Sequence, residues 1–394
     1  MHIHEFLAKE LLSRRGVSIA TGRVAESAAD VEKLVQGRGP GRYVVKAQVQ
    51  AGDRLAGGGI RFAESPAEAR IAAAAMLGQP LVTRQTGPRG EKVRWVYVEE
   101  AVTALTNLYV AIALDPATGE IVALGSGTPV DDSEPNAISD RGQLERLRVR
   151  IVDNLPVADF GALARRIAPA TADAEKLGAL LQLLATAFVE LDATLVEINP
   201  LAVTADGRYV AVDAKMTIDD NALFRHPEIG AWRDTVMQED GDAGELASDR
   251  HNINYIGMDG DIGLVVNGAG LALATLDMLK AAGGRPANFM DVRTTATSLD
   301  VAFGFDLLLA NPALRAVLLN VHGGGMQRCD TIVEGMAISM RRSGRRLPLV
   351  VRLAGNNAEF ARDRLKTFGI QYIEGATIAE AVERVVAFGK REAA

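Results

Sequence analysis

Two neighbouring segments of this 394-residue chain, 195–200 and 212–215, alternate apolar and polar residues with a period of two. This alternation is typical of strands that bury one face and expose the other. Between them, Ala205-Asp206-Gly207 predicts a three-residue hairpin loop with Gly207 in the left-handed conformation. The pattern therefore predicts an antiparallel pair of strands centred on Asp206.

The register of this hairpin brings four polar side chains onto one face. Counting outward from the loop, Asn199 lies opposite Asp213 and Glu197 lies opposite Lys215. The apolar residues expected on the other face are Val196, Ile198, Val212 and Ala214. A two-residue loop would shift the register and move Asp213 to the wrong face. An amide oxygen beside a carboxylate suits a Mg²⁺ ion that also binds phosphate oxygens, which indicates a catalytic face; an ordinary solvated hairpin is the alternative.

The first part of the chain mixes helical and strand patterns. Helices are predicted at His4–Arg15, Ala28–Gln36, Ser65–Leu77 and Ala172–Leu191. Strands are predicted at Arg42–Gln48, Lys92–Glu99 and Leu108–Leu114, the last two as a hairpin. The segment 225–249 is rich in charge and short of apolar residues, which predicts an interdomain linker.

From about Tyr255 the pattern changes to repeated strand–turn–helix units. Apolar strands that run into glycine-containing turns and then helices are predicted at Asp261–Asn267, Arg315–Val321 and Leu347–Leu353, and the second of them leads into a helix at Cys329–Arg341. A strand at Ile370–Glu374 and a helix at Thr377–Ala387 close the series. Apolar strands that alternate with helices predict a parallel sheet covered on both faces. Ligands of such sheets bind at the carboxyl ends of the strands, where these turns lie.

Composition and charge narrow the class of protein. The length predicts two or three domains, each with its own core. A net charge of −7 without a long basic run argues against nucleic acid as the main partner. The chain shows neither an apolar stretch of membrane-spanning length nor a signal peptide, so no membrane partner is expected. The single cysteine, Cys329, excludes an internal disulfide and indicates a cytoplasmic protein.

The motifs of the hairpin region carry a specific resemblance. Leu195-Val-Glu-Ile-Asn-Pro200, Val212-Asp-Ala-Lys215 and Asp219-Asp-Asn-Ala-Leu-Phe-Arg225 closely resemble the β subunits of succinyl-CoA synthetases, the ADP- or GDP-forming succinate–CoA ligases. The similarity extends from His4-Glu-Phe-Leu-Ala-Lys-Glu-Leu-Leu12 to the final helix. It implies an α/β fold, with an N-terminal ATP-grasp domain at 1–238 and a flavodoxin-like or Rossmann-like parallel-sheet CoA-ligase domain at 239–394.

The resemblance also implies an activity. Members of this family are β subunits that form acyl-CoA from an organic acid, CoA and ATP or GTP with Mg²⁺. The reaction passes through a phosphohistidine on a separate α subunit, and succinate is the default acid. None of the five histidines of this chain lies where that phosphohistidine would be. The chain is therefore expected to need an α partner.

By the same resemblance, residues of the first domain outline a nucleotide site. Lys46, which ends the apolar run 43–45, and Arg54 would contact the phosphates. Glu99 would lie near the adenine and ribose.

The resemblance also assigns residues on the polar face of the hairpin to this site. Asn199 and Asp213 would hold Mg²⁺. Glu197 would orient the phosphohistidine of the partner, because a carboxylate bonded to an imidazole fixes its tautomer and stabilises its charged form.

The loop after the Lys46 strand departs from the family pattern. Relatives usually read Gly-Gly-Arg-Gly-Lys-Ala-Gly-Gly, whereas this chain reads Gly52-Asp-Arg-Leu-Ala-Gly-Gly-Gly59. Asp53 adds a negative charge beside phosphates, a repulsion of several kcal/mol at about 4 Å and an effective dielectric of about 20. Leu55 removes the conformational freedom of glycine. Val102 stands for a threonine and Asn107 for a glutamate at two further nucleotide-binding positions, so nucleotide use is altered or lost.

In the second domain the resemblance assigns the organic acid to two turns. Asn267, in Val266-Asn-Gly-Ala-Gly270, would bind the acid beside a helix N-terminus. Backbone amides of Gly324, Gly325 and Met326, at a second predicted helix N-terminus, would hold its carboxylate.

Three more residues of this domain have two interpretations each. His322 replaces an aromatic residue in a turn that is longer by one residue, and it either recognises an extra polar group or packs in the core. Arg293 replaces a glycine and either recognises a second carboxylate or sulfonate or pairs with Asp291. Cys329 is interpreted as a buried small residue rather than a reactive thiol.

Two alternatives to a succinate ligase remain. Arg293, His322 and the longer turn favour malate or another substituted acid. The altered loop at 52–59 and Asn107 favour a non-catalytic paralogue that keeps the fold, whereas the intact hairpin residues oppose it. A dinucleotide-binding module is excluded, because the chain lacks the Gly-x-Gly-x-x-Gly spacing and its downstream acid.

Overall fold

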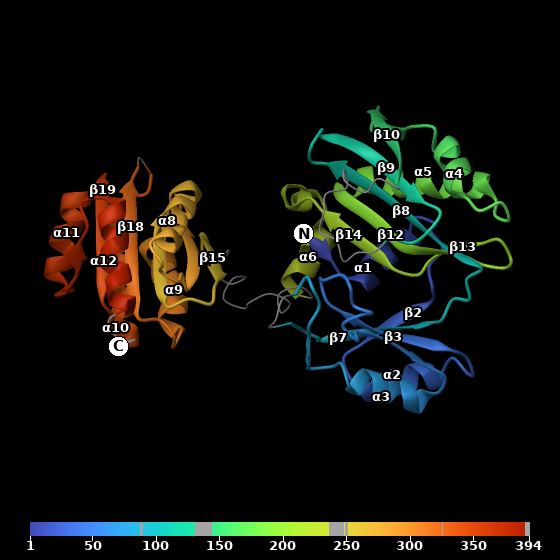
Figure 1. Cartoon of the computed structure of the whole chain (residues 1–394), viewed down its shortest axis with the longest axis horizontal. Coiled ribbons are helices and arrows are strands. Elements are labelled where there is room, and N and C mark those ends of the chain that lie inside the picture. The colour runs from blue at the N-terminus through green and yellow to red at the C-terminus, as the bar shows by residue number, and fades with distance from the viewer. Residues whose placement is uncertain (87–89, 131–143, 236–247, 249–250, 325, 391–394) are drawn as a thin grey trace. The chain divides into compact units, whose positions relative to one another are not determined.

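The computed structural model describes residues 1–86, 90–130, 144–235, 248, 251–324 and 326–390. Contacts between Cα atoms divide the chain into two compact units, Met1–Asp240 and Gly241–Ala394 (Figure 1). The boundary expected between residues 238 and 239 lies outside the described residues. Each unit has hydrophobic core clusters of its own.

The larger sheet of the first unit is antiparallel, with the order β1-β14-β12-β8-β9-β10-β11 and β13 paired to β12. Its strands are β1 (His2–Ile3), β8 (Thr106–Asp115), β9 (Glu120–Ser126), β10 (Glu145–Val152), β11 (Leu155–Val157), β12 (Ala193–Val203), β13 (Tyr209–Ala211) and β14 (Ala214–Ile218). The helices that share its core are α1 (Glu5–Ser13), α4 (Phe160–Ile167) and α5 (Ala174–Glu190). Together they form the large lobe.

The smaller sheet has the order β2-β7-β3-β4. Its strands are β2 (Gly22–Ala25), β3 (Tyr43–Gln48), β4 (Ile60–Ala63) and β7 (Trp95–Glu100). The helices α2 (Ala28–Gln36) and α3 (Pro66–Ala74) cover one face (Figure 1), and the short strands β5 (Pro80–Leu81) and β6 (Glu91–Lys92) pair separately. Together they form the small lobe.

The predicted hairpin between the segments 92–99 and 108–114 is wrong. β7 pairs with β2 and β3 in the small lobe. β8 pairs with β9 and β12 in the large lobe. Both predicted strands are present, but the short connection between them crosses from the small lobe to the large lobe. Two strands that are adjacent in the sequence therefore belong to different sheets.

Side-chain caps explain where four helices of the first unit begin. The capping residues, whose side-chain oxygens accept hydrogen bonds from first-turn amides, are Ser27, Ser65, Asp159 and Asp173. Such caps satisfy amides that have no acceptor within the helix. The helix predicted at Ala28–Gln36 is confirmed with the same bounds.

The first half of the predicted linker is structured. The 3₁₀ helix η1 (Asp220–Arg225) and α6 (Pro227–Thr235) follow β14. Ile229 is 3% exposed and Trp232 packs against the same core as the large sheet. The prediction of a linker over 225–249 is therefore wrong up to residue 235, because two apolar residues at helical spacing suffice to dock this charge-rich segment.

The second unit contains one sheet with the order β15-β17-β16-β18-β19-β20. Its elements are β15 (Ile253–Gly257), β16 (Ile262–Asn267), α8 (Ala269–Ala281), β17 (Asn288–Val292), α9 (Ser298–Ala310), β18 (Ala316–Gly323), α10 (Cys329–Ser343), β19 (Leu349–Gly355), α11 (Ala358–Thr367), β20 (Ile373–Glu374) and α12 (Ile378–Lys390). All pairs are parallel except β15 with β17. α8 and α12 cover one face, and α9, α10 and α11 cover the other. The predicted parallel sheet with two covered faces is confirmed.

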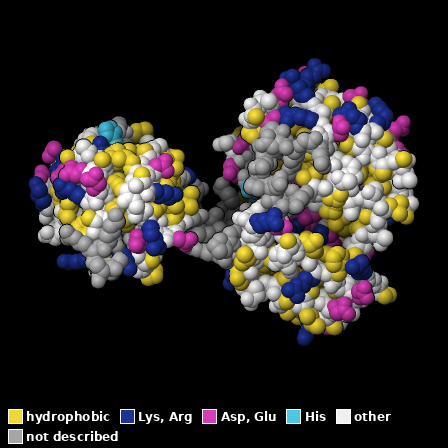
Figure 2. Space-filling model, viewed as in Figure 1, with side chains coloured by type: hydrophobic (Ala, Val, Ile, Leu, Met, Phe, Trp, Pro, Cys, Tyr) yellow, Lys and Arg dark blue, Asp and Glu magenta, His cyan; other side chains and the backbone are white. Residues whose placement is uncertain are grey.

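The surface of both units carries mixed charge. On the face shown in Figure 2, Lys and Arg side chains are interspersed with Asp and Glu side chains. In the part of the chain that the structure describes, no helix combines the length and apolar character needed to cross a membrane.

Candidate active site

The hairpin predicted around Asp206 is present with the predicted register. Glu197 on β12 pairs with Lys215 on β14. Gly207 has a φ of +76°, so it supplies the left-handed turn residue. The local alternation and the turn residue together thus fixed which side chains share a face.

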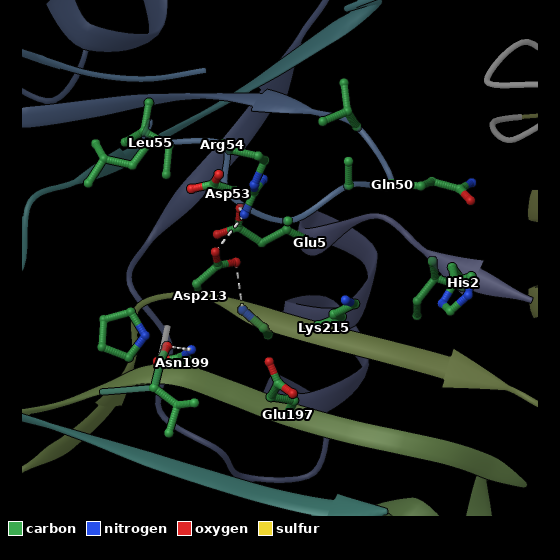
Figure 3. A pocket seen from close by; sticks show the side chains of 18 residues that line it. His2, Glu5, Gln50, Asp53, Arg54, Leu55, Glu197, Asn199, Asp213 and Lys215 are labelled. Atoms are coloured by element: carbon green, nitrogen blue, oxygen red, sulfur yellow. Dashed lines mark hydrogen bonds and ion pairs between the residues drawn. The ribbon is translucent and has the colours of Figure 1, made fainter. Parts of the chain in front are cut away.

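A cavity of about 330 Å³ opens beside this hairpin (Figure 3). The polar side chains that the hairpin contributes to its wall are Glu197, Asn199, Asp213 and Lys215. The loop 49–55, which follows β3 of the small lobe, forms the opposite wall together with Glu5 at the start of α1. Both lobes of the first unit therefore line one cavity, and its size lies at the small end of ligand pockets.

Asn199 and Asp213 present oxygen donors to this cavity (Figure 3). The amide nitrogen of Asn199 donates to the carbonyl of Val130 at 2.7 Å, so the amide oxygen is turned the other way. Within the described ranges, no group of three or more His, Cys, Asp and Glu side chains gathers into a metal site. An amide oxygen with one carboxylate fits Mg²⁺, which keeps several waters and binds phosphates of a substrate.

Six charged side chains form an ion-pair network next to the cavity, which we call the interlobe cluster. Its members are Glu5, Lys9, Lys46, Arg54, Glu99 and Asp213. They come from α1, β3, the loop after β3, β7 and the segment before β14. Three positive and three negative charges balance, so the cluster joins the two lobes without net charge.

Lys46 is buried inside the interlobe cluster. Its Nζ lies 2.8 Å from Glu5 Oε1 and 2.6 Å from Glu99 Oε1, and it donates to the carbonyl of Val212 at 2.6 Å. Lys9 contacts the same three residues at 2.8, 2.5 and 2.6 Å. An ammonium has three N–H donors, so three acceptors satisfy it. In this structure Lys46 therefore does not reach the cavity, and its contact with phosphates stays a prediction.

Arg54 is the cation of the cluster that lines the cavity (Figure 3). Its Nη2 lies 2.6 Å from Asp213 Oδ2 and 2.8 Å from Glu5 Oε2, and its Nη1 donates to the carbonyl of Ala47 at 3.0 Å. The residue expected to bind phosphate is thus ion-paired with the residue expected to bind metal. Whatever binds Asp213 must compete with Arg54.

The two buried glutamates of the cluster differ in acidity. Burial opposes the ionisation of Glu5, but Lys46, Lys9 and Arg54 outweigh burial and hold the pKa of Glu5 well below its usual range. Burial raises the pKa of Glu99 above its ordinary value, because the two lysines do not fully offset burial and the nearby charge of Glu5. Glu5 is therefore the anchoring charge of the cluster.

The loop residues that replace family glycines line the cavity. Asp53 has a φ of +59°, a left-handed backbone that aspartate tolerates better than most residues with a Cβ. Its carboxylate lies 3.8 Å from Arg84 Nε, which partly offsets its charge. The side chain of Leu55 is 64% exposed. Asp53 and Leu55 therefore line the same cavity as Arg54 and Asp213, and their contact with a nucleotide phosphate stays a prediction.

Three other predicted nucleotide residues do not line this cavity. Glu99 is 1% exposed and held by Lys9 and Lys46. Val102 lies between β7 and β8, and Asn107 lies on β8. Their contacts with a nucleotide stay predictions.

Glu197 extends into the cavity from β12 (Figure 3). The hydroxyl of Tyr109, a buried residue of β8, donates to Glu197 Oε2 at 3.2 Å. This bond restrains the carboxylate on the polar face of the hairpin, where it can accept a hydrogen bond from a group that enters the cavity.

Sequence reasoning missed Glu5, Lys9 and Tyr109. Glu5 and Lys9 are four residues apart on α1, a spacing that puts two side chains on one helix face. Both are at most 5% exposed. These two opposite charges lie on the buried face of an amphipathic helix, where apolar residues are expected. That exception to the pattern is a signal that could have found Glu5 and Lys9.

Asn267 is fixed at the carboxyl end of β16. Its amide donates to the carbonyl of His322 and accepts from the backbone N–H of His322, both at 2.8 Å. The two bonds join the ends of β16 and β18. Asn267 thus lies at the predicted edge, and its contact with an acid stays a prediction.

The helix N-terminus predicted at residues 324–326 is wrong. α10 begins at Cys329, with Arg328 as its N-cap, which confirms the start of the helix predicted at Cys329–Arg341. Gly324 instead donates its N–H to the carbonyl of Gln327 at 3.0 Å, and Met326 is 73% exposed; Gly325 lies outside the described residues. The amides that lack an acceptor within the helix are those of its own first turn, from residue 329 onward.

The structure decides or narrows the two interpretations given above for His322, Arg293 and Cys329. The side chain of His322 is exposed, so the interpretation of a core histidine is wrong. Arg293 donates to the amide oxygen of Asn254 at 2.9 Å, and Asn254 donates to Asp291 at 2.9 Å, so an amide links the cation to the carboxylate. Cys329 is fully buried, and burial raises the pKa of its thiol, which confirms the interpretation of a buried small residue.

Two family models match the chain. An ATP-grasp domain model matches residues 2–203 and a CoA-ligase model matches residues 265–386. The chain is 42% identical to the succinate–CoA ligase [ADP-forming] subunit beta of Burkholderia lata over 387 residues, which cover 98% of this chain and 99% of the relative. The same subunit of Cupriavidus taiwanensis is 41% identical with the same coverage.

One solved structure shares the fold over nearly the whole length. ATP citrate lyase from Methanothrix soehngenii, in complex with citrate and coenzyme A, superposes with a TM-score of 0.74, covering 98% of this chain and 99% of that chain. The sequences are 16% identical, so this likeness concerns the fold alone. The expected fold, an ATP-grasp domain followed by a CoA-ligase domain, is confirmed.

Proposed function

The chain belongs to the β-subunit family of ADP-forming succinate–CoA ligases, enzymes that form a carbon–sulfur bond, and on that premise we propose that its first unit binds Mg²⁺–ATP in the cavity between the two lobes. The relatives are named β subunits, so an α subunit would complete the enzyme. The acid would be succinate, as in the names of those relatives. A partner histidine would carry the phosphoryl group from the first unit to the acid.

One observation carries this proposal. Asn199, Asp213 and Glu197 line the same cavity as the loop around Arg54. The donor pair, the carboxylate restrained by Tyr109 and the guanidinium thus lie within one enclosure (Figure 3). This is the set that phosphoryl transfer to an imidazole requires: oxygen donors for metal, a cation for phosphate and an acceptor for the ring N–H.

The chain's own residues would perform three tasks. Asn199 and Asp213 would hold Mg²⁺, which when bound supplies positive charge to the phosphate oxygens. Arg54 would leave Asp213 and contact a phosphate, exchanging one anionic partner for another while Glu5 keeps it near the cavity. Glu197 would accept a hydrogen bond from the imidazole of the partner and orient its attacking nitrogen.

The test is transfer of the labelled γ-phosphate of ATP to the α subunit in the co-purified complex, without any organic acid. The variant Asp213→Asn removes the metal-binding charge with little change of shape. The matched control is Asp206→Asn, an exposed aspartate at the tip of the same hairpin. We expect labelling in the parent and the control, and a loss of about 100-fold or more in Asp213→Asn, the size typical of removing one charge-stabilising contact at a reacting phosphate.

Absence of labelling in a stable parent complex, with ATP and with GTP, would contradict the proposal. That outcome would favour a non-catalytic paralogue, in which the Arg54–Asp213 ion pair is never opened. Equal labelling in Asp213→Asn and the parent would remove Asp213 from the site.

A further inference from the structure

Arg352, near the carboxyl end of β19, is a half-buried cation without a balancing carboxylate among the described residues. Its Nη1 donates to Oδ1 of Asn320 at 3.4 Å, a long and weak hydrogen bond. Its Nε is buried with no acceptor in the described part of the chain. A guanidinium in such a place has lost part of its hydration and gained little in return.

Other half-buried arginines of the same unit have closer hydrogen-bond or ion-pair partners than Arg352. Arg362, on α11, is 21% exposed, yet it contacts Glu374 at 2.6 Å and Glu359 at 2.7 Å. Arg364 lies 2.6 Å from Glu334. Two half-buried arginines of this unit are thus paired with carboxylates, and Arg345 donates to backbone carbonyls at 2.5–2.8 Å, whereas Arg352 has only the long bond to Asn320.

The partner of Arg352 is itself held rigidly. Asn320 on β18 is fully buried, and its amide nitrogen donates to Thr275 Oγ1 at 2.7 Å. Thr275, on α8, in turn donates to the carbonyl of Leu271 at 2.7 Å. Because Asn320 is anchored to the first turns of α8, its amide oxygen fixes one end of the guanidinium while leaving the charge unbalanced.

The position of Arg352 points to the substrate edge of the sheet. It follows Val350 by two residues, and Val350 packs with α8 and α12, so strand alternation puts the arginine side chain on that same face. β19 ends three residues later, at Gly355. Ligands of parallel sheets bind at this carboxyl edge.

The helices that begin at this edge also favour an anion. α8, α10 and α11 each start without a side-chain cap. In contrast, α9 has a full capping box made by Thr297 and Asp300. Uncapped first-turn amides carry partial positive charge, so three helix termini and one unbalanced guanidinium converge on the same edge.

We propose that Arg352 is an acid-binding residue of this ligase, whose guanidinium holds an oxyanion of the organic acid or of the phosphate that becomes attached to it. This inference rests on the proposed function. It adds a side-chain cation to a site that resemblance builds from Asn267 and backbone amides alone. The required ligand chemistry is a carboxylate or a phosphate, each of which supplies the missing charge in the bidentate geometry that arginine favours.

The test uses the complete αβ complex and the variant Arg352→Gln. The Michaelis constant for succinate is measured in the forward direction, and that for inorganic phosphate in the reverse direction. We expect one or both to rise about 10- to 100-fold, the effect of losing a charge-assisted hydrogen bond. Labelling of the α-subunit histidine from ATP, which needs no acid, should stay within about twofold of the parent.

Matched variants separate binding from folding. Arg362→Gln removes a neighbouring arginine that is already paired, and it should leave both Michaelis constants unchanged. Arg352→Lys keeps the charge and should recover part of the loss. Should Arg352→Gln fail to fold, the same two constants measured on Arg352→Lys decide, because a lysine lacks the bidentate fork and should still weaken binding measurably.

The outcomes are distinguishable from those of the proposed function. A larger rise for succinate identifies the carboxylate as the partner, and a larger rise for phosphate identifies the phosphoryl group; both support the proposal. Unchanged constants in Arg352→Gln with normal labelling overturn it. If the parent complex itself shows no labelling, calorimetric binding of succinate and of inorganic phosphate to the complex decides, and equal affinities for parent and variant overturn the inference.

Discussion

The two units of this protein handle buried charge in opposite ways. In the first unit, the interlobe cluster brings three cations and three carboxylates together, and each cation has found its partners within the protein. At the carboxyl edge of the second unit, Arg352 lacks a carboxylate partner among the described residues, and α8, α10 and α11 begin without a side-chain cap. The interlobe cluster is internally neutral, whereas a bound anion would supply the negative charge that Arg352 lacks.

Because of this difference, a ligand would replace an existing ion pair at the first site and would add a missing one at the second. In the first unit, a Mg²⁺–nucleotide that binds as proposed would replace an existing contact, because Arg54 is ion-paired with Asp213. Opening that ion pair would exchange one interaction for another, so we expect a modest net gain, and the contacts of Glu5 with Lys46 and Arg54 would still join the lobes. In the second unit, an anion that binds as proposed would pair with a guanidinium that has no carboxylate partner among the described residues, so we expect the larger electrostatic gain there.

The largest expected effect concerns the anchor of the interlobe cluster. Glu5→Gln leaves Lys9, Lys46 and Arg54 with one buried carboxylate fewer, which should lower the free energy of unfolding of the first unit by about 3–5 kcal/mol. Both tryptophans of the chain, Trp95 and Trp232, lie in the first unit, so their fluorescence during denaturation reports on it alone.

The matched control is Glu10→Gln on the same helix. Glu10 pairs with Arg14 at the surface, where both side chains are nearly half exposed. It should cost less than about 1 kcal/mol. Equal losses in the two variants would show that the interlobe cluster contributes no more than a surface pair.

The contribution of Glu5 to the stability of the first unit should depend on pH. The pKa of Glu5 is well below its ordinary value of 4.5, so its contribution to stability is fully present above that value and is lost as the pH falls through the lowered folded-state pKa. The pKa of Glu99 is raised, so its own term has the opposite sign: it is present at low pH and lost as the pH rises through the raised folded-state pKa.

We therefore expect the difference in unfolding free energy between the parent and Glu5→Gln to shrink on acidification from about pH 5 to about pH 3. Denaturation curves at a series of pH values measure it. A difference that stays constant over this range would mean that Glu5 is not held ionised by the lysines.

The smallest effect is expected at the carboxyl edge of the second unit. Asn267→Ala removes two hydrogen bonds to the backbone of His322 and should cost about 1–2 kcal/mol. Hydrogen exchange at the ends of β16 and β18 measures it locally. Asn356→Ala is the control, because the side-chain hydrogen bond of Asn356 to the carbonyl of Gly324 is 3.4 Å long and weak. An equal loss of local stability in both variants would show that the bonds of Asn267 do not hold the ends of β16 and β18 together.

The sequence predicted those parts of the fold and site that depend on local pattern. The register of Glu197 with Lys215 followed from alternation and from Gly207, and the parallel sheet followed from apolar strands between helices. The motifs also indicated the family, which the comparisons show.

What the sequence could not predict depends on contacts between distant segments. Lys46 ends an apolar run and so was expected to face a ligand, but Glu5 and Glu99, which neutralise it, come from another helix and another strand. The start of α10 at Cys329 was predicted, but the contacts of the turn before it were missed for a related reason. The backbone N–H of Cys329 donates to the carbonyl of Asn356, and that of Asn356 donates to the carbonyl of Gly323, contacts that a motif position alone cannot show.

The most direct test of the account is calorimetric binding of ADP to the αβ complex with and without Mg²⁺. The account predicts Mg²⁺-dependent binding that weakens about 30-fold or more in Asp213→Asn, equivalent to about 2 kcal/mol, and is unchanged in Asp206→Asn. Equal affinity in the parent and Asp213→Asn, or binding indifferent to Mg²⁺, would contradict the assignment of the hairpin face as the metal–nucleotide site.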